Sequence, residues 1–283
     1  MLNSVKTVLL LGLMTGLLLL AGGLMGGRGG MIIAFFFAVV MNFTSYWASD
    51  KIVLAVYRAR EVSRDDDPEL HDIVEQLAAR ASIPRPRIYR IPGAAMNAFA
   101  TGRDPAHAVV AVTDGLRRAL DREELEGVLA HELSHVIHRD ILISTVAATL
   151  AGAIMMMATM ARWGAIFGGF SRRDDDDGGL VGLLAAAFLA PIAAVLIQMA
   201  VSRSREFHAD ASGAALAGNP YGLARALEKL EHGARARPLK AAPATSHLFI
   251  VHPFLGGMGR LFSTHPSTAE RIRRLTGRVP LRA

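Results

Sequence analysis

Four long apolar blocks constrain the fold of this chain more than any other feature of its sequence. A helix of about 20 apolar residues crosses the hydrocarbon core of a bilayer, and each block approaches or exceeds that length. We therefore predict four transmembrane helices arranged as two hairpins. A cleaved signal peptide is the alternative for the first block, and two buried core helices are the alternative for the last two. The blocks are Val5–Gly27, Met31–Trp47, Ile141–Ala161 and Leu180–Ala200.

The composition agrees with a membrane protein and limits its chemistry. Hydrophobic residues make up 52% of the 283 positions, and charged residues only 20%. The chain has no cysteine, so any metal must be bound by His, Asp or Glu. The net charge is +6, but no run of Lys and Arg is long enough to predict binding of nucleic acid.

Basic residues near the apolar blocks predict the orientation in the membrane. Four of them lie between 51 and 64, directly after the second block, and basic loops stay on the cytoplasmic side. We therefore expect both termini and the polar segments in the cytoplasm, and the loop around Arg28 outside. The acidic run 174–177 would be a solvated outer loop, because it lacks the spaced ligands of a calcium site.

The polar segment after the first hairpin is predicted to be a small α+β unit. Asp67 and Pro68 are typical of an N-cap and a first helical residue, and apolar residues then recur at helical spacing. The acidic run 65–67 is expected to be a solvated helix start and not a cation site. Alternating residues predict strands at 87–91 and 108–113. Helices are also expected from 220 to about 231 and at 270–275.

The segment 121–140 contains the pattern H-E-x-x-H within a predicted helix. Asp121 and Glu124 have the spacing of a capping box. On a helix, His131 and His135 lie on one side and present two imidazoles to one point, which suits two corners of a tetrahedral zinc site. Glu132 lies one step round the helix and could take a proton from water at that metal. Two buried histidines and a surface glutamate are the alternative interpretation.

Two histidines leave such a site one protein ligand short. His138 shares their face but lies ~10 Å along the helix axis from His131, so both cannot reach one metal on a continuous helix. Glu206 is the better candidate, with Asp210 one turn later to accept the second N–H of a ligating histidine. A juxtamembrane charge is the alternative role for Glu206, and solvent exposure is expected for His208.

The run H-E-L-S-H-V-I-H-R-D, followed after the second hairpin by S-R-E-F-H-A-D, resembles the HtpX family of bacterial membrane-bound zinc metalloproteases. That family is related to the CAAX prenyl proteases. Shorter likenesses at 96–100 and 264–272 extend the resemblance over essentially the whole chain. The resemblance implies three ligands for one zinc ion per chain and one catalytic base. The ligands would be His131, His135 and Glu206, and the base Glu132.

The resemblance also implies two weaker site residues and a biological role. Asn97 falls in the segment that would line the cleft, where a substrate strand could add to an edge, and His265 would stabilise the oxyanion. The implied role is membrane-protein quality control under heat or envelope stress. Its substrates would be misfolded or damaged membrane proteins and unfolded polypeptides, and the lipid bilayer is the expected surroundings.

The expected fold is a mainly α membrane protein with four transmembrane helices and a zincin-type α+β metalloprotease domain that has a small sheet. The hairpins would occupy 1–49 and 141–200. The protease domain would be formed by 50–140, which holds the H-E-x-x-H helix, and by 201–283, which holds the third ligand. The expected location is the bacterial inner membrane, as a multi-pass protein with the protease domain and both termini in the cytoplasm.

A non-proteolytic membrane scaffold or holdase with a structural metal is the alternative function. A structural zinc site normally has four protein ligands, whereas the sequence offers three strong ones, and Glu132 would have no purpose in it. A transporter would need ionisable residues inside the spans, which are nearly free of them. The sequence names no substrate, cleavage preference or oligomeric state, and assigns no role to the loop at 233–259.

Overall fold

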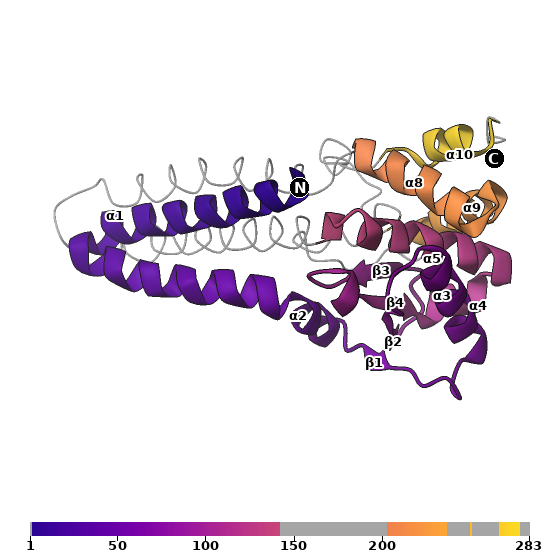
Figure 1. Ribbon diagram of the computed structural model, residues 1–283, viewed down its shortest axis with the longest axis horizontal. Helices are drawn as coiled ribbons and strands as arrows, with labels where there is room; N and C mark the ends of the chain where they lie inside the picture. The colour runs from indigo at the N-terminus through magenta and orange to yellow at the C-terminus, as the bar shows by residue number, and fades with distance from the viewer. Residues whose placement is uncertain (1, 142–202, 237–249, 251–265, 278–283) are drawn as a thin grey trace.

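The computed structural model describes residues 2–141, 203–236, 250 and 266–277. The second predicted hairpin, the acidic run 174–177, His265 and most of the loop at 233–259 lie outside these residues. In the described part, a long helical hairpin extends from one end of the molecule, and the remaining helices and the sheet pack together at the other end (Figure 1).

The hairpin is formed by α1 (Leu2–Trp47), whose helical backbone folds back on itself (Figure 1). Gly27 has a φ of 55°, a conformation that glycine adopts without steric cost. The two arms approach closely, since a Cβ built on Gly30 would lie 2.1 Å from the Gly22 carbonyl oxygen. Farther from the turn, the Asn42 side-chain amide donates to Thr15 Oγ1 at 2.9 Å, which satisfies two polar groups between apolar arms.

The two arms of α1 differ in the length of their apolar stretches. The 18-residue window Gly27–Thr44 is long and apolar enough to cross a membrane. The other arm is helical as well, but its apolar stretch Leu11–Leu20 is shorter than a full span. Large apolar side chains on both arms face outward, for example Val8 at 68% exposure and Ile33 at 73%.

The sheet has four strands in the order β1-β2-β4-β3. β1 pairs antiparallel with β2, β2 pairs parallel with β4, and β3 pairs antiparallel with β4, so the sheet is mixed and β3 forms one edge. The predicted strands are confirmed as β2 and β4, whereas β1 and β3 were missed. The bounds are β1 Arg60–Glu61, β2 Arg87–Ile91, β3 Ala98–Thr101 and β4 Val109–Thr113, with a 3-10 turn at Pro105–His107.

Both faces of the sheet are covered, because alternate residues of each strand point to opposite sides. One face packs on α2 (Ser49–Val56), the helix that follows the membrane hairpin, through Leu54 and the ring of Phe99. Tyr57 lies at the end of α2 with its ring centroid 5.6 Å from that of Phe99. The other face packs on the main core of the molecule, through residues such as Val110 and Val112.

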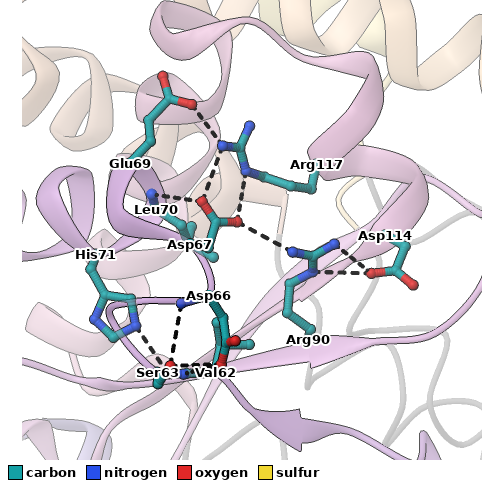
Figure 2. Close-up of polar contacts among 10 residues, drawn as sticks. All are labelled: Val62, Ser63, Asp66, Asp67, Glu69, Leu70, His71, Arg90, Asp114 and Arg117. Carbon is teal, nitrogen blue, oxygen red and sulfur yellow. Dashed lines mark hydrogen bonds and ion pairs between the residues drawn. The ribbon is translucent and has the colours of Figure 1, made fainter.

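The predicted helix after Asp67 is confirmed as α3 (Pro68–Arg80), with the Asp67 side chain accepting from the Leu70 N–H at 3.2 Å. The expected solvation of the acidic run is wrong for Asp67, which is 6% exposed. Its carboxylate accepts from Arg117 and Arg90, which also binds Asp114 (Figure 2). Burial works to raise the pKa of Asp67, but the hydrogen bond from Arg117 and the other contacts outweigh it and lower the pKa.

The helix at the centre of the molecule is α5 (Arg122–Ile137), which lies between the sheet and the C-terminal helices (Figure 1). Glycine allows two of these helices to approach it. A Cβ on Gly127 would lie 2.4 Å from the Leu223 nitrogen, and a Cβ on Gly213 would lie 2.8 Å from the His131 Cα. The remaining helices are α4 (Asp114–Ala119), α8 (Arg203–Ala217), α9 (Pro220–Ala236) and α10 (Thr268–Thr276).

Candidate metal centre

The predicted capping box at the start of α5 is confirmed. The Asp121 side chain accepts from the Glu124 N–H at 2.9 Å, and the Glu124 side chain accepts from the Asp121 N–H at 2.9 Å. This cap fixes where the helix begins. The separation of four residues then places His131 and His135 on one side of the helix. Their ring centroids are 4.9 Å apart, and the two rings are nearly perpendicular at 88°.

Glu206 of α8 completes a group of three possible metal ligands with these histidines. One donor atom from each residue lies within 4.8 Å of the other two. The Glu206 carboxylate is 3.8 Å from His131 Nε2 and 3.7 Å from His135 Nε2. Ligands about 2.0–2.2 Å from a common tetrahedral zinc ion are themselves separated by ~3.3–3.6 Å, so these atoms are spaced to hold one ion.

Each histidine directs its other ring nitrogen at a carboxylate. His131 Nδ1 lies 3.0 Å from Asp210 Oδ1, and His135 Nδ1 lies 3.5 Å from Asp140 Oδ2. A hydrogen bond from Nδ1 leaves the lone pair of Nε2 free for a metal, and it holds the ring in place. Asp210 thus lies where the sequence predicted a partner for a ligating histidine.

Two carboxylates at the site are buried, and one of them is paired with Arg271. Glu206 is 8% exposed and Asp210 3% exposed. Burial alone would raise the pKa of Asp210, but Arg271 and His131 outweigh it and lower that pKa well below the usual range. The donor set suits zinc, because it combines two nitrogen donors with one carboxylate ligand. A second carboxylate lies behind one of the two rings.

Glu132 lies beside the three ligands but is not a member of the group. Its Oε2 accepts from the Ala100 N–H at 3.0 Å, so the carboxylate is anchored to the edge strand β3. Burial raises the pKa of Glu132, although the neighbouring histidines act in the opposite direction. A buried carboxylate with a raised pKa is a stronger base, which is the property that a proton acceptor needs.

His135 has an altered protonation equilibrium. Burial works to lower its pKa, but the hydrogen bond with Asp140 and the charges of Glu206 and Glu132 raise it to about 8. A proton and a metal compete for the same nitrogen, so this shift affects metal binding at neutral pH.

Asn97 occupies the turn that leads into β3. It is 4% exposed, its N–H donates to Thr113 Oγ1 at 2.9 Å, and its carbonyl accepts from the Thr113 N–H at 2.9 Å. Its Oδ1 accepts from the Ile250 N–H at 3.3 Å. Asn97 therefore fixes the start of the edge strand. The other weakly predicted residue, His265, lies outside the described residues.

His138 lies away from the three ligands, at the C-terminal end of α5. It is half-buried, and its ring stacks on His208 of α8 with centroids 4.3 Å apart. The group of three ligands does not include it. His208 is exposed, as expected, but its ring is also part of this contact.

Sequence reasoning missed two residues that contact the site, Asp140 and Arg271. Asp140 follows His135 by five positions, and no local pattern distinguishes it from other acidic residues near helix ends. Arg271 had a detectable signal, because it shares a helix face with Leu275. An arginine on the apolar face of a short helix indicates a buried charge with an acidic partner.

Comparison with known proteins shows the family to which this chain belongs. A profile of Peptidase family M48 matches residues 64–279. A protein named "Protease HtpX homolog" from Desulfatibacillum aliphaticivorans is 58% identical over 280 residues, covering 98% of this chain and 90% of that protein. One with the same name from Pyrococcus furiosus is 58% identical over 273 residues, covering 96% of this chain and 94% of its own length. The family resemblance of the sequence motifs is thereby confirmed.

A solved structure shares the fold. The crystal structure of S. mikatae Ste24p superimposes with a TM-score of 0.52 at 20% identity. The alignment covers 97% of this chain and 64% of that one. The described residues therefore belong to a helix-rich fold with a small mixed sheet, of the Ste24-like type.

Proposed function

Because this chain belongs to peptidase family M48 and is a membrane metalloprotease, we propose that it cleaves misfolded or damaged membrane proteins in membrane-protein quality control. One observation carries the proposed chemistry. Two histidines and one glutamate form a group of possible ligands, and the buried carboxylate of Glu132 lies beside this group without belonging to it. The membrane hairpin is followed by α2, which packs directly on the sheet. This connection supports the proposal that substrates reach the site from the bilayer.

The proposed ligands of one zinc ion are His131, His135 and Glu206. Three protein ligands leave a fourth position open to water, which is typical of catalytic zinc sites and not of structural ones. Among the described residues no fourth ligand joins the group, which disfavours the alternative of a scaffold with a structural metal. When bound, the metal supplies a Lewis acid that activates water and polarises a peptide carbonyl.

Glu132 is the proposed general base. Its carboxylate is buried beside the ligands, and its contact with the Ala100 N–H fixes its position. It accepts the proton from the attacking water and delivers it to the leaving nitrogen, so no covalent intermediate with the protein is needed. Burial raises the pKa of Glu132, which makes its carboxylate a better proton acceptor.

The edge strand β3 is the proposed place where substrate binds. Phe99 and Ala111 face each other in the antiparallel β3–β4 pair, and Ala100 directs its N–H away from β4 toward Glu132. A substrate in extended form can add along such an edge by backbone hydrogen bonds. Its scissile bond would then lie beside the base and the metal ligands.

The experiment compares Glu132→Gln with the parent chain in detergent, using casein or a membrane-protein substrate and measuring zinc content. We expect Glu132→Gln to lose at least about a hundredfold in cleavage rate while it keeps close to one zinc per chain, because it removes the proton acceptor alone. Glu206→Gln should lose both cleavage and metal.

Glu123→Gln is the matched control, since Glu123 lies on the same helix and its side chain is 47% exposed. It should cleave and bind zinc like the parent. Cleavage by Glu132→Gln at the parental rate would overturn the proposed mechanism. Normal zinc in Glu206→Gln, with loss of zinc in His138→Ala, would show that the third ligand is misassigned.

A further inference from the structure

Arg271 lies in the interior, although it belongs to a short helix rich in exposed arginines. It is 1% exposed, whereas the side chains of Arg273 and Arg274 on the same helix are each 53% exposed. Arginine is almost never fully buried unless its charge is paired. The position of Arg271 therefore depends on what its guanidinium contacts.

The guanidinium binds the carboxylate behind the metal site. Arg271 Nε donates to Asp210 Oδ2 at 2.8 Å, and Nη2 donates to Asp210 Oδ1 at 2.6 Å. The same Oδ1 lies 3.0 Å from His131 Nδ1. The guanidinium also has longer contacts with two proposed ligands, because Nη2 lies 3.5 Å from both ring nitrogens of His131 and Nη1 lies 4.0 Å from Glu206 Oε2. This two-point contact fixes the plane of the Asp210 carboxylate, so one of its oxygens is held in line with the imidazole N–H.

We propose that Arg271 is a positioning residue of the metal centre, which orients His131 through Asp210 and links the metal ligands to the edge strand β3. The proposal rests on the proposed function of His131 as a ligand. Without Arg271, the Asp210 carboxylate would be a buried charge free to rotate, and the imidazole would lose its fixed acceptor.

The link to β3 uses Nη1 of the same guanidinium. Arg271 Nη1 donates to the Ile250 carbonyl at 2.8 Å, and the Ile250 N–H donates to Asn97 Oδ1 at 3.3 Å. Asn97 is bonded through its backbone to Thr113 and directly precedes β3. The C-terminal helix α10 therefore stabilises the metal side and the substrate side of the site through one residue.

These contacts require arginine and not only a positive charge. Three nitrogens of one planar group donate in fixed directions to two acceptors, and two of them donate to the same carboxylate. A lysine ammonium is a single point charge and cannot reproduce this fork. Arg271→Lys thus keeps the charge that pairs with Asp210 but loses the orientation, which makes it the informative variant.

The test measures metal binding directly on the full chain in detergent, by chelator competition with Zn²⁺ and by the visible spectrum of the Co²⁺ form. We expect Arg271→Lys to bind Zn²⁺ roughly tenfold to a hundredfold more weakly and to shift the Co²⁺ spectrum, as changes behind a ligating histidine do. At saturating zinc its KM should rise severalfold, because β3 loses its tie through Ile250. Arg273→Gln on the same helix is the matched control and should resemble the parent.

A double variant separates positioning from a general loss of stability. Asp210→Asn combined with Arg271→Gln leaves no unpaired buried charge. It should bind Zn²⁺ no more weakly than Asp210→Asn alone, because the proposed role of Arg271 runs through Asp210 and not through its longer contacts with His131 and Glu206. If the two substitutions cause additive losses of Zn²⁺ affinity, or if Arg271→Lys binds Zn²⁺ like the parent, the positioning role is overturned. If the KM of Arg271→Lys is unchanged, the link to β3 is overturned. Since metal affinity is read without proteolysis, failure of the proposed protease mechanism would leave this result intact.

Discussion

At the scale of single residues, protonation of His135 should control metal binding near neutral pH. Its pKa is raised to about 8, so the imidazole of the metal-free protein is neutral above that pH and protonated below it. A metal must then displace a proton, and affinity should fall about tenfold per pH unit below about pH 8. Zinc competition titrations of the chelator-treated chain between about pH 6.5 and pH 8.5 measure this slope.

Asp140 offers a way to move that transition. Its carboxylate stabilises the protonated ring of His135, so Asp140→Asn should lower the pKa and shift the loss of affinity to lower pH. His232→Gln alters an exposed histidine on α9 and should leave the profile unchanged. A zinc affinity that does not change over this pH range would contradict the assignment of the raised pKa to the metal site.

At the scale of secondary-structure elements, the distance between α5 and α8 decides whether Glu206 reaches the two histidines. Gly213 permits the contact, since a Cβ there would lie 2.8 Å from both the Cα and the nitrogen of His131. Gly213→Ala should push the helices apart, weaken zinc binding and lower the free energy of unfolding by about 1–3 kcal/mol. Thermal unfolding with and without zinc, together with zinc competition, measures both effects.

Ala211→Leu is the comparison for this change, because it adds more atoms to the exposed face of α8. It should alter the free energy of unfolding by no more than about 0.5 kcal/mol and leave zinc affinity as in the parent. If Gly213→Ala behaves in the same way, close approach of the two helices does not determine the geometry of the ligands.

At the scale of the whole molecule, the two helices that carry the proposed metal ligands must lie on one side of the membrane. The first pair of ligands precedes the predicted hairpin at 141–200, and Glu206 follows it, so an even number of spans must separate them. The excess of Lys and Arg beside the protease segments places that side in the cytoplasm, which remains a prediction. The prediction can be tested because the chain has no native cysteine.

Cysteines introduced singly at Asp175 and at Ser212 report the orientation. An impermeant thiol reagent added to intact cells should label the cysteine at 175 and not the one at 212, whereas both should react after the cells are opened. Labelling of position 212 alone would place the protease segments outside the cytoplasm and contradict a role in cytoplasmic quality control.

The parts of the site that depend on spacing along one helix can be predicted from the amino-acid sequence. A capping box at Asp121 and Glu124 defines where α5 begins, and a separation of four residues brings His131 and His135 to one side. The helix α3 and the strands β2 and β4 follow from local periodicity in the same way. These features arise within a few consecutive residues, so the chain order contains all the information they need.

Contacts between residues that are distant in the sequence depend on the fold and could not be predicted. β3 is four residues of Ala, Phe, Ala and Thr with no strong strand pattern, and it is a strand because β4 pairs with it. Asp67 is buried because two arginines from other elements neutralise its charge. Arg271 lies 61 residues beyond Asp210, and no spacing rule connects the two. A buried charge needs a partner, but the fold determines which residue supplies it, because long-range contacts leave no periodic trace in the sequence.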